Sequence, residues 1–215
     1  MQLLSEAPVA RRPRLIIPGQ PHHITHRGNN RMQIFRDAAD FDKCMSLLIS
    51  SSSRSKCSVH SHVLMDNHFH LLVTPVDKDG PADFMQSFAS AYALYYNKRY
   101  ERTGTLWEGR YDSFVVGSDR YFFNCTRYIE MNPVRALMVA HPAEYLHSSY
   151  LCNAFGIPNP LVASHPLYES LGGHSEERHS AYRQLFTHHL DDQSCDEVRN
   201  ATRTGKTLGG NDPET

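Results

Sequence analysis

The apolar residues of the first two thirds of the chain follow two spacings. Short runs rich in β-branched and aromatic residues, bounded by turn residues, indicate strands, and apolar positions three and four apart indicate helices. The pattern predicts strands over His22–Arg27, Val59–Leu64, Phe69–Thr74 and Leu106–Val116. It predicts helices over Asp37–Arg54 and Ala82–Arg102, and a third from Ser118 or Asp119 to about Asn132.

Turn and breaker residues separate these segments. Gly28-Asn29-Asn30 suits a turn after the first strand, and Met65-Asp66-Asn67 suits a hairpin. Gly80-Pro81 is expected to break the chain, Gly104 to stop the second helix, and Pro133 to mark the end of the third. The element order is that of an α+β, ferredoxin-like (RRM-like) fold, an antiparallel sheet with helices on one face.

The two ends of the chain differ from this middle part. Residues 1–20 contain a basic segment interrupted by proline and are expected to form an arm. Residues 141–215 are loop-rich at first and are expected to form a C-terminal extension with helices over Glu176–Leu190 and Cys195–Thr204 and a loose polar end. The main domain is therefore expected to span residues 21–140.

The composition is that of a globular protein, with 40% hydrophobic and 21% charged residues among 215. No apolar run is long enough to cross a bilayer, and the N-terminus lacks the apolar core of a signal peptide. Five widely spaced cysteines without a Cys-x-x-Cys pair argue against a zinc ribbon or a disulfide framework. A cytoplasmic protein with reduced thiols is expected.

The charges are unevenly distributed. A net charge of −1 argues weakly against a nucleic-acid-binding protein. However, residues 1–137 contain 17 Lys and Arg against 13 Asp and Glu, a balance of +4, whereas residues 138–215 contain 5 against 10, a balance of −5. A phosphate-facing surface is therefore expected in the first part, and little of one in the tail.

The densest chemical motif is Asp66-Asn67-His68-Phe69-His70. Residues two apart in a strand point to the same side, so His68 and His70 present two imidazoles together while Phe69 enters the core. Two neutral imidazoles on one face suit a metal ion. Because the chain has 14 histidines, a pair of ordinary surface histidines is the alternative.

A second pair of residues can complete such a site. Tyr128 and Asn132 are four apart and share a helical face. The amide oxygen of Asn132 is a candidate third ligand, and a nitrogen and oxygen set with open positions suits Mg²⁺ or Mn²⁺ better than zinc. Tyrosine, with a reference pKa of about 10, can attack a phosphodiester if a metal polarises the phosphoryl oxygen. The product is a covalent phosphotyrosine; a packing role is the alternative for Tyr128.

Several residues are candidates for DNA contacts. These are Arg11, Arg12, Arg14, Arg27, Asn29, Asn30, Arg31, Trp107 and Arg110, with Lys98 and Arg99 as further phosphate contacts or a solvated helix face. The arm arginines suit phosphates or a groove, or are simply solvated. The residues after the first strand suit unpaired bases or turn chemistry. The single tryptophan suits base stacking or a core position.

Together these motifs resemble the REP-associated tyrosine transposases, relatives of the single-tyrosine HUH transposases of the IS200-like type. The resemblance covers roughly residues 12–150. It rests on His68-Phe69-His70 and on Tyr128 to Ala136, with the flanking segments His26 to Arg31, Gly104 to Tyr111, Pro142 to Tyr145 and Ser148 to Tyr150.

The resemblance implies a ferredoxin-like catalytic core. It implies His68 and His70 as ligands of a divalent metal, Asn132 as the third ligand, and Tyr128 as the nucleophile that forms a 5′-phosphotyrosine and a free 3′-hydroxyl. Relatives from insertion sequences often carry Gln at the position of Asn132. The implied substrate is single-stranded DNA beside an imperfect hairpin from repeated extragenic palindromes, cleaved and rejoined by a monomer or a homodimer, with no membrane partner.

Two other functions remain open from the sequence. One is a ferredoxin-like module that binds structured nucleic acid without turnover. The other is a metal-dependent hydrolase that uses water as the nucleophile on another phosphoester. Whether the tyrosine acts within its own chain or across a dimer is also open.

Overall fold

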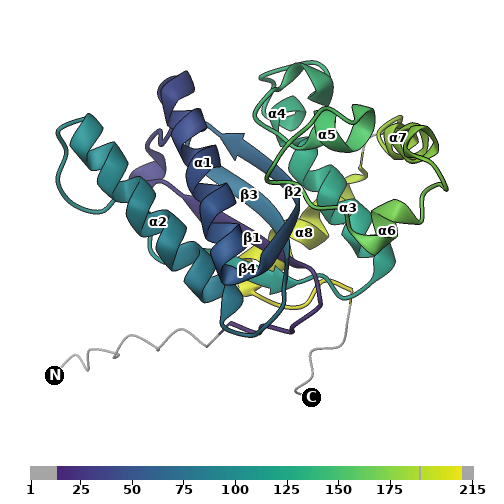
Figure 1. Cartoon of the computed structure of the whole chain (residues 1–215), viewed down its shortest axis with the longest axis horizontal. Helices are drawn as coiled ribbons and strands as arrows, with labels where there is room; N and C mark the ends of the chain where they lie inside the picture. Colours follow the sequence, from purple (N-terminus) through teal and green to yellow (C-terminus); the bar gives the residue numbers. More distant parts are fainter. Residues whose placement is uncertain (1–13, 189, 210–215) are drawn as a thin grey trace, which may run out of the picture.

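The computed structural model describes residues 14–188 and 190–209 and contains a four-stranded sheet in this part of the chain. The strands are β1 (His22–Arg27), β2 (Cys57–Met65), β3 (His68–Pro75) and β4 (Asp112–Val115). Their order is β2-β3-β1-β4 and every neighbouring pair is antiparallel (Figure 1). With α1 (Ala38–Ser55) after β1 and α2 (Gly80–Arg99) after β3, this is the predicted ferredoxin-like arrangement, and the α+β fold class is confirmed.

The remaining helices follow the last strand, apart from the short 3₁₀ turn η1 (Asn29–Arg31) after β1. They are α3 (Asp119–Glu130), α4 (Asn132–Arg135), η2 (Pro142–Glu144), α5 (Tyr150–Phe155), α6 (Pro166–Glu169), α7 (Ser175–Gln184) and α8 (Asp192–Thr204).

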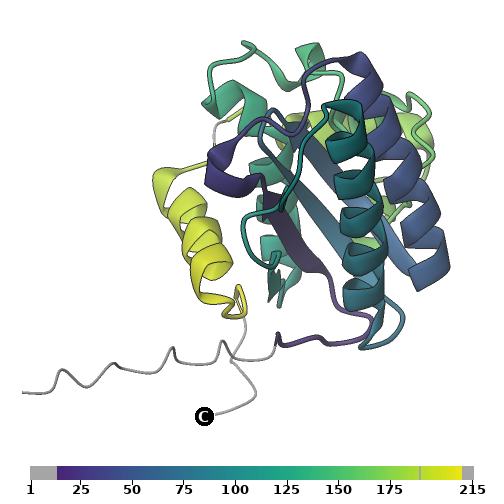
Figure 2. The same cartoon turned by 90° about the vertical axis from the view of Figure 1, so that its left-hand side faces the viewer.

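The sheet is covered on both faces. On one face, Phe69 and Leu71 of β3 pack with Leu48 of α1 and Phe88 of α2. The opposite face carries α3 and α8, which contact each other and the sheet, with Val198 of α8 in the shared core (Figure 2). Burial on both faces explains why β3 is apolar over most of its length, since each side of the strand meets a hydrophobic core. The sequence analysis expected helices on one face only, and the structure has a second helical layer on the other face.

Two prolines stand in first turns of helices: Pro81 was expected just before the second helix, whereas Pro133 was expected to end the third. Gly80 and Pro81 form the first turn of α2, and Pro133 stands in the first turn of α4. Proline is tolerated there because its missing N–H has no helical partner at that position. The third predicted helix is therefore two helices, α3 and α4, which meet at Met131.

Other boundaries are shorter or longer than expected. Only Asp112–Val115 of the segment 106–116 is a strand. The helix predicted over Glu176–Leu190 is α7, which ends at Gln184, and the one predicted from Cys195 is α8, which already begins at Asp192. Part of the end expected to be loose is fixed, because Leu208 is buried and its backbone bonds to Val115 and Gly117.

The extension covers the outer edge of β2. The backbone N–H of Leu64 donates to the carbonyl of His147 over 2.9 Å, and the N–H of Ala163 donates to Val59 over 2.7 Å. These bonds satisfy groups that an open sheet edge would leave unpaired. The described part of residues 141–215 is thus packed onto the sheet.

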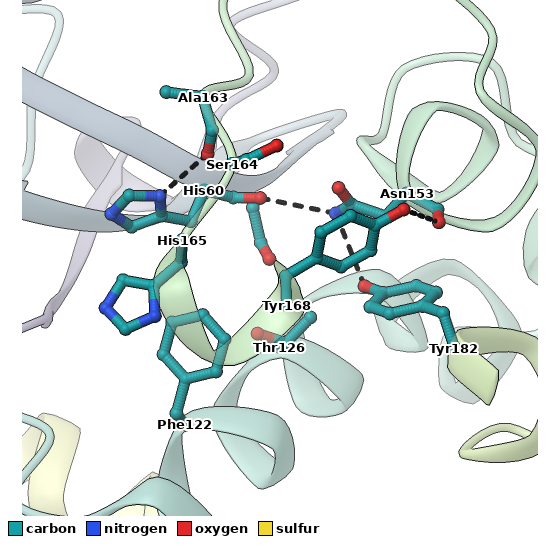
Figure 3. A pocket seen from close by; sticks show the side chains of 10 residues that line it. His60, Phe122, Thr126, Asn153, Ala163, Ser164, His165, Tyr168 and Tyr182 are labelled. Atoms are coloured by element: carbon teal, nitrogen blue, oxygen red, sulfur yellow. Dashed lines mark hydrogen bonds between the residues drawn. The ribbon is translucent and has the colours of Figure 1, made fainter. Parts of the chain in front are cut away.

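A buried carboxylate ties α3 to this extension. Glu130 is fully buried and accepts hydrogen bonds from Ser149 Oγ at 2.5 Å, Tyr182 Oη at 2.6 Å and Asn153 Nδ2 at 3.0 Å. Figure 3 shows Asn153 and Tyr182 on one side of a small adjoining pocket. Burial raises the pKa of Glu130 to about 7, against a partial opposing effect of its three donors.

This raised pKa predicts that stability falls as the pH rises. The unfolded chain loses the Glu130 proton near pH 4.5 and the folded chain near pH 7, so the folded state binds more protons between these values. Relative to Glu130→Gln, the wild type should lose roughly 2–3 kcal/mol of unfolding free energy between pH 5 and pH 8. Urea unfolding of both proteins at both pH values measures this. If the unfolding free energies of the two proteins changed in parallel with pH, this prediction would be contradicted.

Candidate active site

A cleft of about 540 Å³ opens on the α3 and α8 side of the sheet. Its walls come from β1, the β2–β3 hairpin, β4, α3, α4 and α8. The lining residues are Thr25, Arg27, Met65, His68, His70, Asp112, Tyr128, Asn132, Arg135, Ala136, Arg199, Thr202 and Arg203. The four residues predicted for catalysis and metal binding, His68, His70, Tyr128 and Asn132, all lie in this one cleft of one chain.

The two predicted ligand histidines stand side by side on β3. The ring centroids of His68 and His70 are 5.0 Å apart, and Phe69 between them points into the opposite core. Each ring already uses its Nδ1: His68 Nδ1 lies 2.7 Å from Asn67 Oδ1, and His70 Nδ1 lies 2.9 Å from His23 Nε2. The Nε2 atom of each ring is therefore the one left for a ligand, because a bond at Nδ1 fixes the ring and its tautomer.

His23 of β1 is a site residue that the sequence analysis missed. Its ring stacks on that of His70, with centroids 4.9 Å apart and planes 7° from parallel. If His70 donates from Nδ1, His23 must carry its own proton on Nδ1, an atom that is buried and has no hydrogen-bond partner among the described residues. His23 thus orients His70 and bears a desolvation cost in doing so.

Burial keeps these imidazoles neutral. It lowers the pKa of His23 to about 3 and that of His68 to about 4, with nearby Arg27 adding to the effect at His68. It also lowers the pKa of His70 well below its usual value, and the neighbouring His23, His68 and Arg135 act in the same direction. Neutral imidazole is the form that binds a metal ion, so the pair is ready for one at physiological pH.

Tyr128 enters the cleft from α3. Its side chain is only 8% exposed, and its ring centroid lies 5.9 Å from that of His70 and 6.2 Å from that of His23. The Asn132 amide donates from Nδ2 to the Tyr128 carbonyl at 3.1 Å, which leaves Oδ1 as its acceptor atom. Tyr128 and Asn132 both line the cleft, although they belong to two helices, α3 and α4, and not to the single helix that was predicted.

Arg135 of α4 was not among the predicted residues. Its guanidinium lies 4.1 Å above the Tyr128 ring and donates from Nη2 to the Tyr128 carbonyl at 2.8 Å. Its Nη1 is buried without a hydrogen-bond partner among the described residues. Burial lowers the pKa of Arg135, while the neighbouring Tyr128 opposes this shift. A positive group with a spare donor thus stands beside the phenol.

Two neutral imidazoles and one amide oxygen line the cleft and would be the candidate ligands of a divalent metal ion. Within the described residues, no three His, Cys, Asp or Glu side chains gather to form a metal site. The available set is two imidazole nitrogens and one amide oxygen, with the remainder of the cleft open. Such a set leaves several coordination positions for water or phosphate oxygens, as Mg²⁺ and Mn²⁺ require.

Of the predicted DNA contacts that the structure describes, only Arg27 is among the residues that line the cleft. Arg27 is exposed and lines it. The 3₁₀ turn η1, which follows β1, contains Asn29, Asn30 and Arg31, and the last two are exposed. Arg110 is exposed on the loop before β4. Arg11 and Arg12 lie outside the described residues. Arg14 is held at the sheet, since it donates to the Tyr111 carbonyl at 2.6 Å and stacks on that ring.

Two candidates have structural roles instead. Trp107 is 7% exposed, donates from Nε1 to the Ala89 carbonyl at 2.9 Å and stacks on His26. A buried indole with its donor satisfied is typical of a core anchor, the second of the two roles predicted for Trp107. Arg99 forms ion pairs with Asp37 and Asp40 at 2.6 and 2.9 Å. These pairs engage the guanidinium group that was predicted as a possible phosphate contact.

Comparison with known proteins defines the class. The family model described as IS200-like transposase matches residues 19–132, more than half of the chain. This chain therefore belongs to the IS200-like transposase family. A search of the curated proteins found no match.

Two solved structures are similar to this chain. A REP-associated tyrosine transposase bound to a REP hairpin has a TM-score of 0.56 and 16% identity, covering 73% of this chain and 93% of that one. A Deinococcus radiodurans R1 protein described as a transposase has 18% identity over 56% of this chain and 95% of its own, but its TM-score of 0.40 is too low to support an argument. At this identity the first match shows the fold alone, and membership in the IS200-like transposase family rests on the family model.

No helix among the described residues has the length and apolar character needed to span a membrane. All five cysteines are unpaired.

Proposed function

We propose that this protein cleaves and rejoins single-stranded DNA beside palindromic hairpins, with Tyr128 as the nucleophile. One observation carries the proposal: a single chain brings the Tyr128 phenol and the His68 and His70 imidazoles into one cleft. Membership in the IS200-like transposase family, and the similar fold of a transposase bound to a REP hairpin, support DNA as the substrate. Residues 21–140 would form the catalytic domain, flanked by the arm and the extension, in a cytoplasmic monomer or homodimer.

The proposed step balances as a transesterification. The Tyr128 oxygen loses its proton and bonds to phosphorus, the bond from phosphorus to the 3′ oxygen breaks, and that oxygen takes up a proton. The products are a 5′-phosphotyrosine and a free 3′-hydroxyl, and attack by a 3′-hydroxyl reverses the step. Because the covalent bond keeps the phosphoester energy, rejoining needs no further energy source.

Chain residues prepare this step. His68, His70 and Asn132 would hold Mg²⁺ or Mn²⁺, which when bound supplies positive charge to a phosphoryl oxygen. His23 fixes the ring of His70, and Arg135 places a further positive charge beside the phenol. These groups stand in fixed positions before the substrate arrives, which lowers the cost of reorganisation in the transition state.

A denaturing gel tests the proposal. The substrate is a pool of hairpin DNAs with randomised single-stranded flanks, labelled at the 3′ end and incubated with protein and Mn²⁺. We expect a labelled band at the mass of protein plus DNA that survives SDS and disappears on proteolysis. The band should not form when EDTA is present during the incubation. Cleaved DNA without an adduct would indicate water as the nucleophile, and binding without cleavage would indicate a recognition module. Fully duplex DNA is the control.

A further inference from the structure

The C-terminal helix contributes to the cleft in a way that its sequence does not indicate. Arg199, Thr202 and Arg203 of α8 line the same cleft as Tyr128, although residues 138–215 carry a balance of −5. The family model ends at residue 132, so α8 lies outside the matched segment. The sequence analysis expected little phosphate-facing surface in the tail and did not predict these two arginines at the cleft.

Helical spacing explains how an acidic segment presents a basic wall. Val198 and Ala201 of α8 are buried in the core shared with α3 and the sheet. Arg199, Thr202 and Arg203 are three and four positions apart, so they form one stripe beside this buried face. The acidic residues of α8, Asp192, Asp196 and Glu197, are not among those that line the cleft.

The cleft is strongly basic as a result. Arg27, Arg135, Arg199 and Arg203 line it, against one acidic residue, Asp112. Arg199 and Arg203 line the same cleft as the Tyr128 side chain. Four guanidinium groups around a phenol favour a polyanion with closely spaced phosphates.

We propose that α8 is a phosphate-binding wall of the active site, in which Arg199 and Arg203 bind backbone phosphates of the strand next to the scissile phosphate. This proposal rests on the proposed function. Both arginines are exposed, and the Arg199–Asp196 pair, 2.8 Å long with side chains 56% and 72% exposed, is easily exchanged for a phosphate. Guanidinium binds phosphate through two parallel hydrogen bonds, which fixes the strand as well as attracting it.

The salt dependence of DNA binding tests the α8 phosphate-binding wall in a protein that does not cleave DNA. Fluorescent hairpin DNA with a single-stranded tail is titrated onto the full chain carrying Tyr128→Phe, with and without Arg199→Gln and Arg203→Gln. We expect affinity to fall about tenfold or more at 0.1 M salt, and the slope of log Kd against log salt to decrease by about 1.4, that is, about 0.7 for each lost single-strand phosphate contact.

The control removes the same charge elsewhere. Lys43→Gln with Lys78→Gln changes two exposed lysines of α1 and the loop before α2, away from the cleft, and should leave the slope within error. Arg199→Lys with Arg203→Lys should restore the slope but only part of the affinity, because lysine keeps the charge without the paired hydrogen bonds. Thermal melting verifies that each variant is folded.

The outcomes separate this inference from the proposed function. If wild type forms an adduct but the double Gln variant binds with unchanged slope and affinity, the wall is refuted. An equal decrease in the lysine control would also refute it, since net charge alone would then explain the effect. If no adduct forms with any substrate but the slope decreases as expected, the proposed function fails while the α8 surface is supported.

Discussion

Tyr128→Phe is expected to abolish the covalent protein–DNA adduct, with a decrease of at least about 10³-fold relative to wild type. The substitution removes one oxygen and keeps the ring that packs against His23, His70 and the Arg135 guanidinium. The side chain is 8% exposed, so phenylalanine fills the same space. The effect therefore reports on chemistry and not on folding.

A matched control stands on the same helix. Tyr121 of α3 is half-buried, is absent from the cleft lining, and packs at Gly209. Tyr121→Phe should leave adduct formation within a fewfold of wild type. Hairpin DNA binding should change little in either variant, since the phenol oxygen supplies no phosphate charge. Cleavage that persists in Tyr128→Phe would identify water as the nucleophile and end the tyrosine mechanism.

Local sequence relations predicted most of the site. The positions of His68 and His70 follow from the two-residue period of a strand, and those of Tyr128 and Asn132 from the four-residue relation on a helix. These relations depend only on the residues between the partners. The structure places all four around one cleft, as the pattern required.

Long-range placement explains what was missed. His23 meets His70 because Thr25 of β1 pairs with His70 of β3, which makes His23 its diagonal neighbour on the same face. Strand register is set by the whole sheet and cannot be counted along one segment. The α8 arginines were overlooked for a related reason: the net charge of a segment does not reveal which face its cations occupy after packing.

Proline shows a different limit. Both Pro81 and Pro133 signal a helix boundary, and the residue alone does not say which side of the boundary is helical. In both cases the helix follows the proline, which stands in its first turn. The consequence at Pro133 is functional, since α4 carries Arg135 back over the Tyr128 ring.

His70→Ala is expected to decrease the rate of adduct formation by at least about 100-fold and to weaken Mn²⁺ binding in parallel. The imidazole is buried, neutral and oriented by His23, so alanine removes one of the two imidazoles proposed to bind the metal. Free Mn²⁺ measured by electron paramagnetic resonance gives the binding constant without DNA. His23→Phe keeps a stacked ring but removes the hydrogen bond to His70, and a smaller loss of about 10–100-fold is expected.

Loss of stability alone would imitate part of this result, and His62 provides the comparison. His62 of β2 is also a buried neutral histidine, since burial lowers its pKa to about 4, but its Nε2 bonds to Asn159 and it does not line the cleft. His62→Ala should destabilise the fold comparably while leaving Mn²⁺ affinity and adduct yield near wild type below its melting temperature. Equal losses in His62→Ala and His70→Ala would mean that His70 acts only through packing, and the metal site would have to be sought elsewhere.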